Sequence, residues 1–183
     1  MKNFKLDRNK AMFMFIDMQP RILKAIDNNE RVLKNSIILA KICEILDMDF
    51  VVTAQYLKGL GSNHEEILKH LKNYVEHSKL TFDSTEDEEI LRDLKAKNKK
   101  QIIVCGIESH ICILQTVRGL LEKGYEVFVV SDALGSRSDS NHQNGLSQLD
   151  QMGAVISNTE TILFDLAGVA GTDTFKKLQA LIK

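Results

Sequence analysis

The chain has 183 residues, of which 44% are hydrophobic and 27% charged, as in a globular protein long enough to bury a core. Its 24 Lys and Arg residues balance 25 Asp and Glu residues, which gives no electrostatic reason to expect nucleic acid or an anionic membrane as a partner. Because no apolar run is long enough to span a bilayer, the first ten residues lack a signal-peptide core and three scattered cysteines do not suggest a disulfide framework, we expect a cytoplasmic protein.

Short apolar runs alternate along the chain with segments of helical periodicity, a pattern typical of a parallel sheet covered by helices. The apolar run over residues 11–16 predicts a first strand, and the spacing from Val32 to Ile45 predicts a helix. The later predicted elements are a strand over 50–54, a loop over 59–62, helices over 64–71 and 88–97, a strand over 101–107, a helix over 112–123, a strand over 125–130, a helix ending at Gly153, a short strand over 154–156 and a helix over 172–182. We therefore predict one α/β domain over residues 1–183, a Rossmann-like sandwich with a central parallel sheet and helices on both faces.

Polar side chains follow three of the predicted strands. Asp17 ends the first strand, Gln55 and Tyr56 follow the second, and residues 108–112 follow the strand over 101–107. In open parallel sheets, ligands bind beyond the carboxyl ends of the strands, so this edge is the predicted site. Lys79 lies in a segment between predicted helices and can fold over the same edge.

Cys112 stands where a strand and a short turn lead into a predicted helix. The N-terminus of a helix offers unpaired N–H groups and a positive dipole end, which favour thiolate over thiol and can hold an oxyanion. Cys43, in an apolar helical stripe, and Cys105, inside a strand, are expected to be buried core residues. Position alone leaves Cys112 equally consistent with a nucleophile and with a buried core thiol.

The segment GIESHICILQTV, over residues 106–117, resembles the nucleophile motif of the isochorismatase-like cysteine hydrolase superfamily. Four further segments match that superfamily in the same order, so the resemblance covers nearly the whole chain: FIDMQ at 15–19, KLTF at 79–82, VVSDALGSRS at 129–138 and GAVISNTETILF at 153–164. Within the superfamily the chain is most similar to the isochorismatase domain-containing protein 2 group. This similarity rests on TAQYLKGLG at 53–61, on the CGIESHICIL turn and on the tail FKKLQALIK.

The resemblance implies an isochorismatase-like fold and a catalytic triad of Asp17, Lys79 and Cys112. Cys112 would be the nucleophile and Asp17 the general acid–base, while Lys79 would stabilise negative charge and hold Asp17 in place. The resemblance also implies an oxyanion hole formed by the backbone N–H groups of Glu108 and Cys112, with a cis peptide bond between Ile107 and Glu108. Such a site would attack an amide-like carbonyl and then hydrolyse the resulting thioester.

The superfamily's metal-containing nicotinamidases carry an Asp-x-His pair directly after the second strand, where this chain has Gln55 and Leu57. Neither residue supplies those ligands, so we predict that the reaction uses no metal and no cofactor. We interpret His64, His70 and His77 as surface residues of helices, because their spacing suits no metal site on one face.

The loops that follow the strands would line the substrate pocket. Gln55, Tyr56 and Phe82 are the predicted substrate-binding residues. Asp132 and Arg137, in the matched DALGSR stretch, are expected to anchor the structure through an ion pair or a loop contact.

Three functions remain open from the sequence. The first is a cysteine hydrolase acting on a small amide or a related C–N bond, and the second is an isochorismate-type vinyl-ether hydrolase. The third is a binding or scaffold protein that keeps the fold but has little turnover. The presence of a thiol favours the first, because vinyl-ether cleavage has no obvious need for one. We expect a small-molecule substrate and a homo-oligomer, a dimer or larger.

Overall fold

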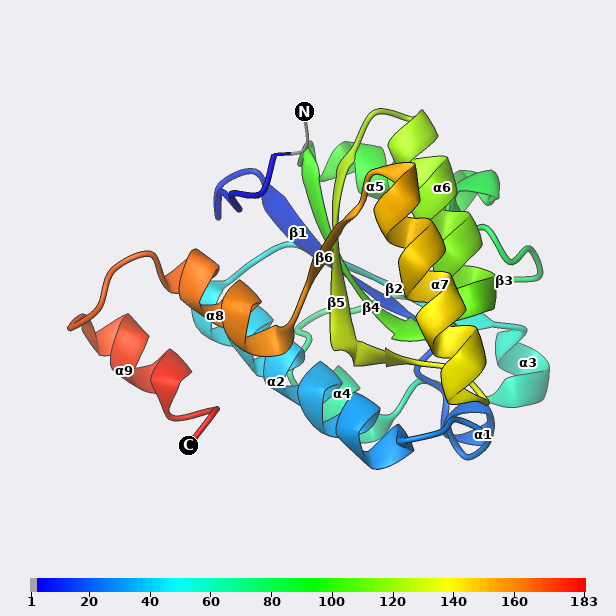
Figure 1. The fold of residues 1–183 in the computed structure, drawn as a ribbon, viewed down its shortest axis with the longest axis horizontal. Coiled ribbons are helices and arrows are strands. Elements are labelled where there is room, and N and C mark those ends of the chain that lie inside the picture. The colour runs from blue at the N-terminus through cyan, green and yellow to red at the C-terminus, as the bar shows by residue number, and fades with distance from the viewer. Residues whose placement is uncertain (1–2) are drawn as a thin grey trace.

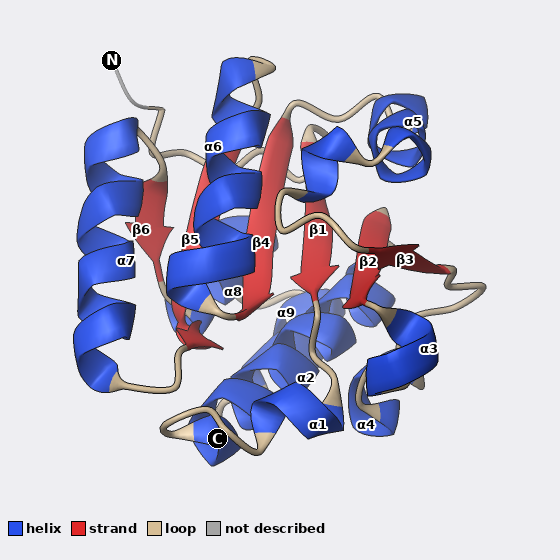
Figure 2. Cartoon of the chain, turned by 90° about the vertical axis from the view of Figure 1, so that its right-hand side faces the viewer, coloured by secondary structure: helices blue, strands red, loops and turns tan. Residues whose placement is uncertain are grey.

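The computed structural model describes residues 3–183, which form a parallel six-stranded sheet of order β3-β2-β1-β4-β5-β6 between two layers of helices (Figures 1 and 2). The strands are β1 (Ala11–Ile16), β2 (Phe50–Gln55), β3 (Glu76–Lys79), β4 (Gln101–Ile107), β5 (Glu126–Gly135) and β6 (Val155–Ser157). Every residue of β1 and β4 is buried, because each of these central strands is covered on both faces. The predicted fold class is confirmed.

Two hydrophobic clusters lie on opposite faces of the sheet. Phe13 and Phe15 of β1 point into one cluster, while Met12 and Met14 point into the other, as the alternation of a strand requires. The first cluster packs against α2 (Asn29–Leu46), α8 (Thr159–Ala167) and α9 (Asp173–Gln179), and the second against α5 (Glu88–Ala96), α6 (Leu114–Glu122) and α7 (Asp139–Met152). Figure 1 shows these two layers on either side of the sheet.

Short helical turns connect the larger elements. They are α1 (Pro20–Leu23), α3 (Leu57–Leu60), α4 (Glu65–Leu68), a 3₁₀ turn at Ser84–Glu86 and a π-helical turn at Ser109–Ile113. Within residues 3–183, no helix combines the length and the apolar character needed to cross a membrane.

The structure differs from the predicted elements mainly where they are short and polar. β3 was not predicted, because its sequence EHSK has no apolar pattern and becomes a strand only by pairing with β2. His77 therefore lies on a strand and not on a helix. The predicted loop over 59–62 overlaps α3, and the helix predicted over 64–71 is shorter, with His64 capping it through a hydrogen bond from the Glu66 N–H. A helix, α8, follows the last strand where only a turn was expected.

The parallel register brings the carboxyl ends of four strands together. Ile16 of β1 pairs with Thr53 of β2 on one side and with Gly106 of β4 on the other, and Gln55 of β2 pairs with Lys79 of β3. Gly106 has a φ of 135°, and a Cβ atom there would lie 2.0 Å from the Ile16 carbonyl oxygen. Only glycine therefore lets β4 approach β1 this closely at the edge that carries the predicted site.

Candidate active site

Asp17 leaves β1 in the left-handed region, with a φ of 54°, and its side chain is fully buried. Asp tolerates this conformation better than most residues. One carboxylate oxygen, Oδ1, accepts a hydrogen bond of 2.7 Å from the Thr53 hydroxyl, and the other, Oδ2, accepts one of 2.7 Å from Lys79 Nζ. The carboxylate is thus held at both oxygens, by a residue of β2 and a residue of β3.

Lys79 is the last residue of β3, and its side chain is buried. Its ammonium group donates to Asp17 Oδ2 at 2.7 Å, to Gln55 Oε1 at 2.6 Å and to the Thr81 carbonyl at 3.3 Å. An ammonium group has three protons, so these three acceptors use all of them. A thiolate that forms beside Lys79 must therefore share one of these N–H groups.

Cys112 lies in the π-helical turn that precedes α6, where its thiol faces the ion pair. The charges and hydrogen-bonding groups that act on the thiol belong to Asp17 and Lys79. The structure therefore brings together the three residues that the resemblance implied as a triad. They are almost closed to solvent, with exposed fractions of 0% for Asp17, 1% for Lys79 and 7% for Cys112.

The thiol of Cys112 is a weak acid in this setting. Burial raises its pKa to about 12, and the charge of Asp17 acts in the same direction, while Lys79 partly opposes them. This is the reverse of the direction expected from a helix N-terminus alone. At neutral pH the resting side chain is therefore a protonated thiol, and a nucleophilic role requires a nearby base.

The turn between β4 and α6 carries both predicted oxyanion donors. The Ile107–Glu108 peptide bond is cis, as the resemblance implied. The Glu108 carbonyl accepts hydrogen bonds from the N–H groups of Ile111 at 3.0 Å and Ile113 at 3.2 Å, which close the turn around Cys112. Glu108 and Cys112 are thus parts of one compact turn.

The side chain of Glu108 is buried and forms an ion pair with Arg137, whose Nη2 donates to Glu108 Oε1 at 2.7 Å. Burial acts to raise the pKa of this carboxyl, but the hydrogen bonds and charge of Arg137 outweigh burial and hold the pKa below its usual range. Asp132 anchors the start of α8. Its Oδ1 accepts one hydrogen bond from the Thr159 backbone N–H at 2.8 Å and another from the Thr159 hydroxyl at 2.9 Å. The expected anchoring roles of Asp132 and Arg137 are confirmed, with different partners.

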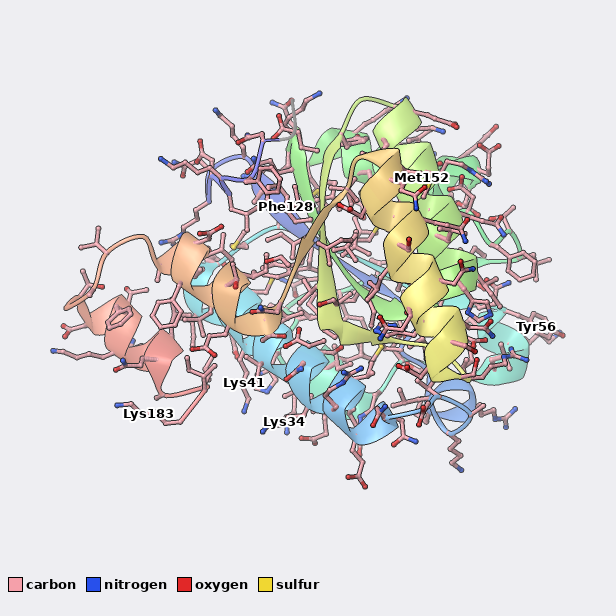
Figure 3. All side chains as sticks on the ribbon, in the orientation of Figure 1. Lys34, Lys41, Tyr56, Phe128, Met152 and Lys183 are labelled. Carbon is pink, nitrogen blue, oxygen red and sulfur yellow. The ribbon has the colours of Figure 1, made fainter. Side chains whose placement is uncertain are left out.

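The three predicted substrate-binding residues differ in their contacts and exposure. Gln55 Oε1 accepts from Lys79, and its Nε2 donates to the Leu80 carbonyl at 3.0 Å, so its side chain is already engaged. Tyr56 is half exposed beside α3 (Figure 3), and its ring lies over Gly59. Phe82 is also half exposed. A substrate-binding role for these residues stays a prediction.

Thr53, which was not predicted as a site residue, donates a hydrogen bond to Asp17 and is fully buried. A threonine inside an apolar strand is usually a core residue, and nothing in the local pattern marks its hydroxyl as functional. Its role follows from the register, which sets Thr53 beside Ile16 and so next to Asp17.

Cavity size does not mark this site. A cavity of about 840 Å³ lies at the opposite edge of the sheet, lined in part by Lys10, Gln101 and Glu126, which stand at the amino ends of β1, β4 and β5. In the described part of the chain, no group of three or more His, Cys, Asp or Glu side chains is arranged to hold a metal ion. A reaction without metal stays a prediction based on the residues at Gln55 and Leu57.

Comparisons with known proteins show the family to which this chain is related. A family model described as the isochorismatase domain matches residues 11–161. The isochorismatase domain-containing protein 2 of Danio rerio is 34% identical over 179 residues, which cover 97% of this chain and 89% of the relative. The predicted resemblance to this group is confirmed.

Two solved structures share the fold over almost their whole length. The MAR1 ribonuclease from Caenorhabditis elegans has a TM-score of 0.91 and 30% identity, covering 97% of this chain and 92% of that chain. The YcaC protein of Escherichia coli, described as an octameric hydrolase of unknown specificity, has a TM-score of 0.93, covering 100% of this chain and 91% of that one. At 20% identity, the second comparison shows the fold alone.

Proposed function

Since this chain belongs to the isochorismatase family, we propose that it is a cysteine hydrolase that cleaves a small amide or a related C–N bond. The observation that carries the proposal is the buried Asp17–Lys79 pair, whose charges act directly on the Cys112 thiol. Cys112 provides the nucleophile and Asp17 the general base, while Lys79 keeps the pair neutral and stabilises the thiolate as it forms. Because burial and the charge of Asp17 favour the neutral thiol, we place the proton transfer to Asp17 in the step in which Cys112 attacks the carbonyl.

In the first half of the reaction, Cys112 Sγ forms a bond to the substrate carbonyl carbon while its proton passes to the Asp17 carboxylate. The electron pair of the C=O bond moves to the oxygen, which accepts hydrogen bonds from the N–H groups of Glu108 and Cys112. The tetrahedral intermediate then collapses. The C–N bond breaks, and the amine leaves with the proton that Asp17 returns.

In the second half, a water molecule attacks the thioester carbonyl and gives a proton to Asp17. The C–S bond breaks, and Cys112 takes the proton back, which leaves a carboxylic acid as product. Each cycle therefore consumes one water molecule and returns Asp17 and Cys112 to their starting protonation states. No step needs a metal or a cofactor.

The other two functions of the sequence analysis have less support. Vinyl-ether hydrolysis gives the thiol no clear role, and a binding protein has no need of a buried base beside it. The worm neighbour is described as a ribonuclease, but in this chain the three N–H groups of Lys79 all donate to protein oxygens, so the Lys79 ammonium group has no free N–H for a phosphodiester. A small molecule is therefore the substrate that we propose.

We also propose a homo-oligomer in the cytoplasm. The E. coli fold relative is described as an octamer, and the three cysteines here are unpaired, as suits a reducing compartment. Light scattering on the purified protein measures the assembly directly; a mass equal to one chain would exclude the oligomer.

A screen of small amides for amine release tests the proposed activity. The unaltered protein should turn over at least one class of amide, and Cys112→Ala should lose that activity with an unchanged circular dichroism spectrum. Cys43→Ala is the matched control, since Cys43 is a buried thiol outside the site and its loss should leave turnover in place. Activity retained by Cys112→Ala would overturn the proposal.

A further inference from the structure

The Glu108 carboxylate is a buried charge directly beside the proposed oxyanion hole, with an exposed fraction of 6%. Arg137 binds both of its oxygens. The arginine N–H donates to Oε2 at 2.9 Å, Nε donates at 3.1 Å to Oε2 and 3.3 Å to Oε1, and Nη2 donates to Oε1 at 2.7 Å. His110 Nδ1 lies 4.0 Å from Oε2. Backbone and guanidinium thus hold the carboxylate in one orientation.

The next two residues of the turn are bound to the same part of the chain. The Ser109 hydroxyl donates to the Gly135 carbonyl at 3.0 Å and lies 2.8 Å from His142 Nδ1. His110 Nδ1 lies 3.0 Å from the Ser136 hydroxyl. Three consecutive residues of the turn between β4 and α6 therefore bind to residues 135–142, which run from the last residue of β5 into the first turn of α7.

A stabilising role alone accounts poorly for the Glu108–Arg137 pair. The Arg137 side chain is 62% exposed, and ion pairs with exposed partners contribute little to folding on average. The hydrogen bonds from Arg137 offset the burial of the Glu108 carboxylate, and they also fix its orientation. The pair also fixes the side chain of Glu108, whose Cα is bonded directly to the nitrogen of the proposed oxyanion donor.

We propose that the Glu108 carboxylate is a positioning group, which through Arg137 aims its own backbone N–H at the oxyanion of the substrate. This inference rests on the proposed function. Oxyanion donors contribute to catalysis only when they are held in place before the charge develops, and a displacement of about 1 Å can lower a rate by about 100-fold. The side chain acts here through the N–H, so variants at the carboxylate keep the donor and change only its orientation.

Two reactions at Cys112 separate donor orientation from nucleophile reactivity. Acylation by p-nitrophenyl acetate passes through a tetrahedral oxyanion and needs the hole. Alkylation by iodoacetamide displaces iodide at a saturated carbon and forms no oxyanion. The ratio of the two rates on Cys112 therefore reports the oxyanion hole, whatever the physiological substrate is.

Glu108→Gln and Arg137→Met should lower the acylation rate by about 10- to 100-fold and change the alkylation rate by less than about twofold. Arg137→Lys keeps the positive charge but loses the two-point hydrogen bonding of the guanidinium group. Its acylation rate should therefore lie between that of Arg137→Met and that of the unaltered protein. Asp132→Asn is the matched control. This substitution weakens the hydrogen bonds between Asp132 on β5 and Thr159, which do not involve the turn that carries Cys112. The acylation and alkylation rates should therefore both stay unchanged.

Equal losses of acylation and alkylation in the Glu108 and Arg137 variants would show that the pair only preserves the fold and would overturn the inference. Unchanged acylation would do the same. Failure of the proposed function looks different. In that case the unaltered protein is alkylated at Cys112 but never acylated, and the inference fails with the function on which it rests.

Discussion

Asp17 has two opposite effects on the Cys112 thiol. Its negative charge disfavours a standing thiolate and contributes, after burial, to the raised pKa of the thiol. Its carboxylate is also the base that can accept the thiol proton when a carbonyl is in place to be attacked. Lys79 works against the first effect, because its positive charge favours negative charge on Cys112.

Asp17→Asn separates these effects while keeping the size of the side chain. Loss of the charge should lower the thiol pKa, so iodoacetamide should alkylate Cys112 faster at neutral pH and the rate–pH curve should shift to lower pH. Turnover should fall by about 100-fold or more, because the general base is gone. Slower alkylation together with lost turnover would contradict the opposing roles assigned to Asp17; thermal melting checks that the variant remains folded.

Thr53→Val tests whether the missed hydroxyl positions Asp17. The valine keeps the branched shape but cannot donate to Oδ1, so kcat should fall by about 10-fold with little change in KM, and unfolding should cost roughly 1–3 kcal/mol less. Thr159→Val is the matched control, since Thr159 donates to the Asp132 carboxylate at 2.9 Å outside the site. A similar loss of kcat in both variants would refute a specific role for Thr53.

At the scale of elements, the sequence predicts the strands and helices that have an apolar pattern, because burial selects that pattern. It does not predict an element that forms only by pairing with a neighbouring strand. The apolar runs of β1 and β4 predict central strands. Gly153 follows the last residue of α7 with a φ of 106°, which is typical of a glycine that ends a helix. β3 has no such pattern, so the strand that carries Lys79 was missed although the residue itself was identified from the family resemblance. Residues 112 and 113, predicted as the start of a helix over 112–123, belong instead to the π-helical turn at Ser109–Ile113.

Gly106→Ala tests the close approach of β4 to β1. Its Cβ would meet the Ile16 carbonyl oxygen at 2.0 Å, and backbone atoms on both sides cannot move aside easily. We expect a loss of more than about 3 kcal/mol in urea unfolding, or failure to fold. Gly153→Ala has a similar positive φ but open space around it, and should lose only about 1–2 kcal/mol. Equal losses at the two positions would contradict the packing argument.

At the scale of the whole molecule, the site is assembled from four strand ends that are far apart in the chain. The preference of ligands for the carboxyl edge of a parallel sheet predicted where Asp17, Gln55 and Cys112 would meet. It did not predict Lys79, since an isolated lysine in a polar segment is usually solvated. The resemblance supplied that residue, and only the structure supplied Thr53, whose function depends on strand register.

The ionisable groups also predict how stability depends on pH. The Glu108 carboxyl has a lowered pKa, so its contribution is present above its ordinary pKa of 4.5 and is lost as pH falls through the lower folded value. Burial raises the pKa values of the Cys43 and Cys112 thiols from 9.0 to about 12. Above pH 9.0 these thiols ionise in the unfolded chain but stay neutral in the folded protein, so the free energy of unfolding decreases as the pH rises. Urea midpoints should fall at both ends of the pH range, and Cys43→Ala should weaken the alkaline loss. An alkaline limb unchanged by that variant would contradict the assignment.

The central claim is that Cys112 forms a thioester with its substrate, and mass spectrometry of the acid-quenched protein during hydrolysis of p-nitrophenyl acetate tests it most directly. We predict one acetyl group on the peptide that contains Cys112, released by hydroxylamine and absent from Cys112→Ala. Hydrolysis that continues in Cys112→Ala, or an acetyl group found only on another residue, would contradict the claim.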